Sequence, residues 1–98
     1  MQIRILDAAE RDLEEGYRFY EKQSPGVGSY FLDSLYSDID SLACFEGIHR
    51  TVFGYYRLLS KRFPFAIYYR ILDEEVLVMG VLDCRRNPSW IRDKLMKR

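Results

Sequence analysis

The sequence has no long hydrophobic run and few cysteines. No apolar stretch approaches the roughly 20 residues that a membrane-spanning helix needs, and residues 1–4 (MQIR) lack the hydrophobic start of a secretory signal. We therefore expect a cytoplasmic protein with no membrane partner. The two cysteines, Cys44 and Cys84, are too few for a secreted disulfide framework and lack the spacing of metal ligands. We expect two ordinary thiols and no bound metal.

The usual sequence signs of catalysis are also missing. There is no glycine-rich phosphate-binding loop, and His49 is the only histidine, without a cluster of carboxylates around it. No serine or cysteine has a histidine base that the sequence identifies. The absence of these motifs disfavours hydrolases, kinases and metalloenzymes, and we expect no bound cofactor. We interpret His49 as a loop or rim residue.

The sequence does have enough apolar and aromatic residues for one small domain. It contains 98 residues, of which 48% are hydrophobic and 15% aromatic. Each buried aromatic side chain removes about 150–250 Å² of surface from water. A hydrophobic core of useful size is therefore within reach, and we expect residues 1–98 to form a single domain.

The charges are unevenly distributed although 15 basic and 15 acidic side chains cancel overall. Residues 1–49 carry 4 basic and 10 acidic side chains, a net charge of −6, and residues 50–98 carry 11 and 5, a net charge of +6. A uniformly basic nucleic-acid binder is thereby excluded. Two interpretations stay open: a local basic surface on the C-terminal half, or two halves that attract each other within one domain.

The hydrophobic pattern of the N-terminal half predicts a strand and two helices. Residues 2–6 alternate polar and apolar, as a short strand does. Asp7, with Glu10 three residues later, is typical of a capping box at the start of a helix. Pro25 is placed to open a second helix. Because the link between the helices is short, we expect an antiparallel helix hairpin.

The C-terminal half predicts an antiparallel sheet. After an irregular segment over residues 45–54, period-two patterns predict strands over residues 56–62, 65–72 and 76–83. Asn87 and Pro88 then begin a short terminal helix. The expected fold is α+β with the order β-α-α-β-β-β, in which the helix hairpin packs on one face of the sheet and the first strand joins that sheet.

Basic and aromatic residues gather in and after these strands. In the middle strand Phe65 and Ile67 are expected to face the helices, which leaves Tyr68 and Arg70 on the open face. Adjacent strands are about 4.8 Å apart, so cations from all of them can converge. The predicted binding surface comprises Arg57, Lys61, Arg62, Tyr68, Arg70, Arg85, Arg86 and Trp90.

This surface has more than one interpretation. Cations beside aromatic rings suit phosphates and unpaired bases, or equally an acidic peptide. Alternatively, the strand arginines protect a sheet edge and Trp90 anchors the terminal helix. If the domain cleaves RNA, Arg57, Lys61 and Arg86 would stabilise charge on the phosphate. A proton acceptor would then be needed, and the candidates are Asp83 and a neutral Lys61.

Three segments that span most of the chain carry a family pattern: residues 12–35 (DLEEGYRFYEKQSPGVGSYFLDSL), 55–71 (YYRLLSKRFPFAIYYRI) and 76–92 (VLVMGVLDCRRNPSWIR). Together they resemble the RelE/ParE superfamily of toxins, and within it the ParE-like, plasmid stabilisation branch. That branch has an aromatic-Pro-aromatic turn, here residues 63–65, and ends in an Arg-Arg-x-Pro segment with a tryptophan after it, here Arg-Arg-Asn-Pro-Ser-Trp at residues 85–90. It commonly has a histidine where this chain has Asp83.

The resemblance implies the toxin of a type II toxin–antitoxin module, a bacterial-type growth inhibitor that a cognate antitoxin neutralises. RelE-like members are ribosome-dependent mRNA endonucleases, whereas ParE-like members poison DNA gyrase by binding it. Arg57 and Arg86 match basic positions of the endonucleases, but Ala66 stands where they have an arginine and Arg92 replaces their terminal tyrosine. The resemblance therefore favours a gyrase-binding toxin. The alternatives are an mRNA endonuclease and a non-toxic binding module that kept the fold.

Overall fold

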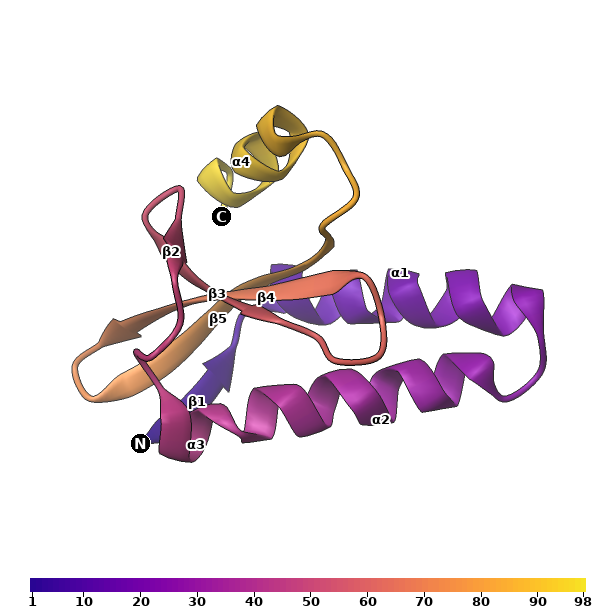
Figure 1. The fold of residues 1–98 in the computed structure, drawn as a ribbon, viewed down its shortest axis with the longest axis horizontal. Coiled ribbons are helices and arrows are strands. Elements are labelled where there is room, and N and C mark those ends of the chain that lie inside the picture. The colour runs from indigo at the N-terminus through magenta and orange to yellow at the C-terminus, as the bar shows by residue number, and fades with distance from the viewer.

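Two antiparallel helices form the first half of the fold. Strand β1 (Gln2–Ile5) leads into α1 (Asp7–Gln23) and α2 (Val27–Asp40), which lie side by side in Figure 1. The structure is a computed structural model that describes residues 1–98. Asp7 is the first residue of α1 rather than its N-cap, and no side chain caps that end. The expected capping box is therefore wrong. Pro25 lies in the turn before α2, followed by Gly26 with φ 91°.

The two helices approach each other closely because glycines face the partner helix. A Cβ on Gly16 would overlap the Phe31 ring, and one on Gly28 would lie 2.7 Å from a backbone oxygen of α1. The Glu21 carboxylate of α1 accepts hydrogen bonds from the N–H groups of Gly26 and Gly28, at 3.1 and 3.0 Å. These bonds satisfy free donors at the start of α2.

The second half of the chain forms the sheet and a terminal helix. Its elements are α3 (Leu42–Phe45), β2 (Thr51–Val52), β3 (Tyr55–Leu59), β4 (Phe65–Leu72), β5 (Glu75–Asp83) and α4 (Pro88–Met96). The sheet has the order β1-β5-β4-β3-β2 and is antiparallel except that β1 runs parallel to β5. The predicted α+β fold, with its helix hairpin, antiparallel sheet and short terminal helix, is confirmed.

The segment expected to be irregular contains one more strand. β2 pairs with β3 through a turn at Phe53 (φ 56°) and Gly54 (φ 83°). Positive φ at both central residues is typical of a tight hairpin turn that matches the twist of its strands. A bulky residue such as phenylalanine seldom occupies this region, which is why the sequence did not indicate a hairpin.

The end of β3 also differs from the prediction. The chain turns after Leu59, where the Ser60 N–H donates to the Phe65 carbonyl oxygen at 2.9 Å. Lys61 and Arg62 therefore lie in the β3–β4 turn and not in a strand.

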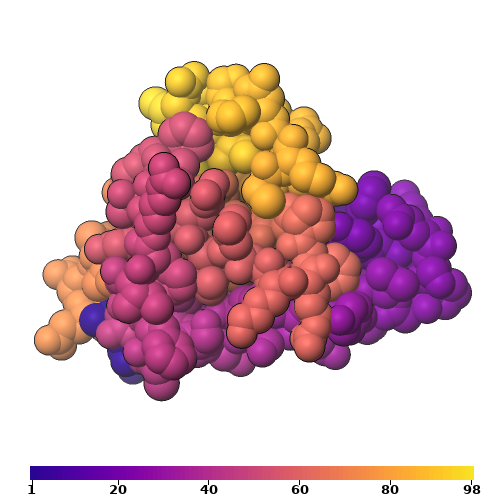
Figure 2. All heavy atoms as spheres, viewed as in Figure 1, coloured from indigo at the N-terminus to yellow at the C-terminus, as the bar shows by residue number.

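Each face of the sheet has its own hydrophobic cluster. On one face Ile67 and Tyr69 pack with apolar residues of α1 and α2, as expected. On the other face Tyr68 belongs to a second cluster, which Ile91 and Leu95 of α4 complete. Figures 1 and 2 show α4, in yellow, on the side of the sheet opposite the α2 helix. Tyr68 is only 1% exposed, so the expectation of an open face is wrong. The apolar side of α4 needs a cover, and the hairpin leaves only this face free.

A β-bulge interrupts the alternation of β5 beneath α4. Gly80 lies opposite Tyr68, but Val78 rather than Met79 lies opposite Tyr69. Met79 is therefore an extra residue in β5. Such a bulge leaves backbone groups without a partner in the neighbouring strand, and other parts of the chain have to satisfy them.

An ion pair between Asp12 of α1 and Arg98 provides hydrogen-bond partners for the backbone groups of this bulge. The buried Asp12 carboxylate accepts the Val81 N–H at 3.0 Å and is paired by both Nη atoms of Arg98, one of them at 2.8 Å. Arg98 also donates to the Met79 carbonyl oxygen at 3.2 Å. Gly80 leaves the room for this arrangement, because a Cβ there would lie 2.8 Å from an Arg98 nitrogen. We call the Asp12–Arg98 pair the latch, since it holds Arg98, the second residue after α4, against α1 and β5.

Candidate binding surface

The structure divides the predicted binding surface into two groups. Arg57, Tyr68 and Arg70 belong to strands, whereas Lys61, Arg62, Arg85, Arg86 and Trp90 lie in the turns after β3 and β5 or on α4. The strand residues do not meet the others on one open surface, because α4 covers the sheet face on which they were expected to converge.

The strand group is largely occupied by contacts with α4 and the sheet. Burial raises the pKa of the Tyr68 hydroxyl, against the opposing effect of the nearby Arg57 guanidinium. Tyr55 is buried, and its hydroxyl donates to the Leu95 carbonyl oxygen at 3.5 Å. The Arg70 guanidinium stacks 4.5 Å from the centre of the Tyr55 ring. Of this group only Arg70 is exposed.

The turn group gathers at one end of the sheet. The turns after β3 and β5 are adjacent, since the Cys84 N–H donates to the Pro64 carbonyl oxygen at 2.9 Å. Lys61 and Arg62 are exposed and form no ion pair. The Arg62 guanidinium lies 5.9 Å from the centre of the Tyr30 ring on α2. One cation of the β3–β4 turn thus lies beside an exposed aromatic ring.

The structure argues against both proton acceptors considered from the sequence. Asp83 is paired with Arg85 by bonds of 2.7 and 3.0 Å. Hydrogen bonds from the Arg85 side chain lower the pKa of Asp83, whereas a general base works best with a pKa near the working pH. Lys61 is exposed in its turn, on the outside of the fold rather than in an enclosed site.

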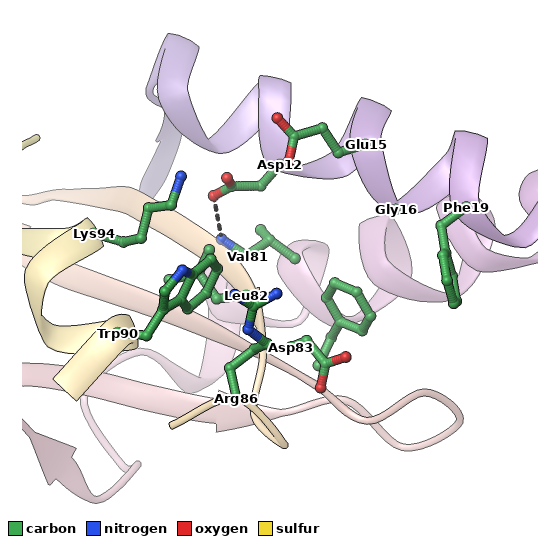
Figure 3. Close-up of a pocket in the computed structure, with 11 residues that line it drawn as sticks. Asp12, Glu15, Gly16, Phe19, Val81, Leu82, Asp83, Arg86, Trp90 and Lys94 are labelled. Atoms are coloured by element: carbon green, nitrogen blue, oxygen red, sulfur yellow. Dashed lines mark hydrogen bonds between the residues drawn. The ribbon is translucent and has the colours of Figure 1, made fainter. Parts of the chain in front are cut away.

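A cleft of about 260 Å³ lies between α1 and α4, beside the turn after β5. Figure 3 shows the α1 side chains on one side and Trp90 and Lys94 of α4 on the other. The centre of the Trp90 ring lies 4.0 Å from the Arg86 guanidinium and 5.3 Å from the Lys94 nitrogen. The cleft is lined by Asp12, Glu15, Gly16, Phe19, Phe65, Val81, Leu82, Asp83, Arg86, Trp90 and Lys94.

The two rims of the cleft differ in charge. On the α1 rim Asp12 is neutralised by Arg98, which leaves Glu15 as a carboxylate without an ion-pair partner. On the opposite rim Arg86 and Lys94 form no ion pair and lie against the indole ring. An apolar floor between an aromatic, cationic rim and a weakly acidic one suits an amphipathic ligand.

Sequence reasoning found Asp83, Arg86 and Trp90 but missed Glu15, Phe19 and Lys94. Phe19 is 53% exposed and lies off the side of α1 whose Ala9, Leu13 and Tyr20 enter the core. An aromatic residue off the apolar side of a helix is a signal that could have been noticed. Lys94 follows Trp90 by four residues, the spacing that places two side chains on one helix face. Glu15 joins them only because α4 docks beside α1, and no local pattern in the sequence indicates that.

The single histidine lies away from the cleft, in the loop before β2, as predicted. The Tyr69 hydroxyl accepts the Gly47 N–H at 2.9 Å and lies within hydrogen-bonding distance of His49 Nδ1. When neutral His49 carries its hydrogen on Nε2, its Nδ1 accepts a hydrogen bond from the Tyr69 hydroxyl. Burial lowers the pKa of His49, which is consistent with a neutral ring that fixes the loop to the sheet.

The structure also shows the state of the two cysteines, of possible metal ligands and of the helices. Cys44 and Cys84 are free thiols. No group of three His, Cys, Asp or Glu side chains is placed to hold a metal ion. No helix combines the length and the apolar character needed to cross a membrane.

Comparisons with known proteins find matches over most of the chain. A family model described as the ParE toxin of the type II toxin–antitoxin system, parDE, matches residues 3–88. No curated protein matches the sequence. Among solved structures, one described as the chromosomal ParDE TA system from P. aeruginosa superposes with a TM-score of 0.76 at 21% sequence identity. The superposition covers 83% of this chain and 92% of that one. At this identity the similarity concerns the fold.

Proposed function

Because the chain belongs to the ParE toxin family of type II toxin–antitoxin systems, we propose that it stops growth by binding an essential target, DNA gyrase. A cognate antitoxin neutralises it by binding in turn. In this proposal the protein works in the cytoplasm through a binding surface. That surface is the cleft between α1 and α4 together with the cations of the adjacent turns.

The observation that supports binding is the accessibility of this cleft. Aromatic rings and arginines are the residues that most often carry the energy of protein interfaces, and here Phe19, Trp90 and Arg86 line one cleft. Of the groups considered for RNA cleavage, the proton acceptor Asp83 is tied to Arg85. Tyr68, which was expected to offer an aromatic surface, is buried beneath α4.

The direct test is DNA supercoiling by purified gyrase in the presence of the purified protein. At micromolar protein we expect the supercoiled product to decrease in proportion to the protein added. The Arg86→Ala variant should inhibit less than the wild type, whereas Arg50→Ala, which removes an exposed arginine outside the cleft, should inhibit equally. Gyrase activity that is unchanged at these concentrations would contradict the gyrase target.

Induced expression in cells separates the alternatives. Growth arrest with messages cut at fixed codon positions, seen by primer extension, would indicate a RelE-like endonuclease. Normal growth would indicate a non-toxic binding module. Arrest without such cuts, relieved by co-expression of the product of the neighbouring gene, is the result that the proposal predicts.

A further inference from the structure

Three arginines lie on the α4 side of the sheet, on three neighbouring strands. Arg57 of β3 is opposite Tyr68 of β4. Arg70, two residues further along β4, faces the same way because successive side chains of a strand alternate. Arg50 directly precedes β2, and its carbonyl oxygen accepts the Arg57 N–H at 2.9 Å, which continues the pairing of β2 with β3. Opposite residues of such a pair share a face. We call Arg50, Arg57 and Arg70 the arginine row.

The arginine row has no carboxylate partner. None of its members forms an ion pair, and two of them are exposed while the one on β3 is half-buried. The carboxylate that shares this sheet face, Glu75, is opposite Leu72 and is paired with Arg4 at 3.2 Å. Asp73 and Glu74 lie beyond the end of β4, in the turn before β5. Three positive charges on one face are therefore not neutralised within the chain.

Folding alone does not account for this arrangement. Like charges directly opposite each other destabilise a pair of strands, and Arg50 and Arg57 are directly opposite. Cations that protect a sheet from aggregation belong on an edge strand, whereas Arg70 is on β4, the central strand of the sheet. The Arg70 guanidinium stacks on Tyr55, but that ring carries no charge that could neutralise it. The arginine row is therefore suited to an external anion.

The rest of the charge distribution turns this face toward a polyanion. The helix hairpin, residues 7–40, has 9 acidic and 3 basic side chains, a net charge of −6, and it packs on the other face of the sheet. Figure 1 shows α4 and the turn between β2 and β3 on the side away from α2. A polyanion is repelled by the helix hairpin and attracted to the arginine row, so the field of the whole protein orients the encounter.

We propose that the arginine row binds the phosphate backbone of double-stranded DNA without recognising its sequence. The row spans two strand spacings, about 10 Å, a length over which a duplex carries several negative charges. Proteins that hold single-stranded nucleic acid stack its bases on aromatic rings, but the rings on this face, Tyr55 and Tyr68, are buried. A duplex needs no such ring, because its backbone alone is contacted. The site is separate from the cleft, and the inference goes beyond the proposed function.

The test is the binding of a short fluorescein-labelled DNA duplex to the purified protein, followed by fluorescence anisotropy at several salt concentrations. Each phosphate contact adds about 0.9 to the slope of log Kd against log salt for a duplex, so three contacts give a slope of about 2.7. The affinity should then fall about 80-fold between roughly 10 and 50 mM salt. A second duplex of unrelated sequence should bind equally.

Variants locate the site. Arg50→Ala and Arg70→Ala each remove one contact, so each should weaken binding at least about tenfold at low salt and lower the slope by about 0.9. Arg70→Lys keeps the charge and should keep the slope, because lysine binds phosphate as a point charge. Arg18→Ala is the matched control. It removes an exposed arginine of α1, away from this face, and should leave the slope unchanged. Circular dichroism of each variant confirms that it is folded.

Several results would overturn the inference. They are a wild-type slope below about 1, binding that Arg50→Ala and Arg70→Ala leave unchanged, and tighter binding of single-stranded RNA of the same length than of the duplex. Loss of affinity in Arg62→Ala alone would assign DNA to the β3–β4 turn instead.

The inference and the proposed function can fail separately. Arg50→Ala should bind DNA weakly and still inhibit gyrase as the wild type does, because it leaves the cleft intact. A protein that binds DNA through the arginine row but leaves gyrase active would keep this inference and contradict the proposed function. Inhibition of gyrase by a protein that does not bind the duplex would keep the proposed function and contradict the inference.

Discussion

Removing the charge of Arg98 should destabilise the domain strongly. The side chains of Arg98 and Asp12 are only 10% and 8% exposed, so the latch holds two charges away from water. In Arg98→Met the Asp12 carboxylate stays buried and keeps one hydrogen bond, from the Val81 N–H. Loss of one partner of a buried ion pair typically costs about 3–5 kcal/mol. We expect about 3 kcal/mol here, the lower limit of that range, because the bond from Val81 remains.

Such a loss is large for a domain of this size. About 3 kcal/mol raises the unfolding equilibrium constant roughly 100-fold and lowers Tm by about 12–24 °C. Urea unfolding followed by circular dichroism measures it. The matched control is Arg92→Met on α4, because this 51% exposed arginine pairs only with its neighbour Asp93. The control should lose less than about 0.5 kcal/mol.

Two results decide whether the latch works as described. Adding Asp12→Asn to Arg98→Met should restore part of the lost stability, because no unpaired charge then stays buried. A loss below about 1 kcal/mol for Arg98→Met, well short of the cost of breaking a buried pair, would refute the reasoning. So would a double variant that is less stable than Arg98→Met.

Three further predictions concern stability. Gly16→Ala should lower the free energy of unfolding, measured in urea, by about 1–3 kcal/mol because the added methyl group meets the Phe31 ring. An unchanged urea midpoint would contradict the close contact between α1 and α2 at this position. Asn87→Ala should cost about 1 kcal/mol, since the Asn87 side chain caps α4, and hydrogen exchange should rise in α4 before any other element. Stability should fall between about pH 7 and pH 5, because burial lowers the pKa of His49 and the unfolded chain takes up the proton first. His49→Gln should reduce this pH dependence. A variant whose stability depends on pH in the same way as that of the wild type would contradict the role given to His49.

The element types could be predicted from the sequence because each pattern has a direct physical cause. Ile67 and Tyr69 alternate with Tyr68 in β4, and successive side chains of a strand face opposite sides. Asn87 before Pro88 likewise indicated a helix start, and its side chain does accept the Ser89 N–H at 2.9 Å.

The features that could not be predicted depend on contacts between distant residues. The bulge at Met79 is stabilised by Asp12 and Arg98, which lie 86 residues apart in sequence. No local pattern assigns α4 to the second face of the sheet, so Tyr68 looked exposed when it is buried.

The candidate site shows the same limit. Arg86 and Trp90 were found because they stand together in one segment. The partners that complete the cleft, Glu15 and Phe19, come from α1, more than half the chain away. Only the docking of α4 beside α1 brings these residues together, and that docking depends on the latch and the second hydrophobic cluster.

Growth of cells that express the wild type, Phe19→Ser or Phe45→Ser tests most directly whether the cleft is where the toxin acts. Wild type and Phe45→Ser should stop growth equally, and Phe19→Ser, expressed to the same level and folded, should allow it. Equal arrest by all of them would show that the cleft has no part in toxicity, and growth with the wild type would contradict a growth-inhibiting role altogether.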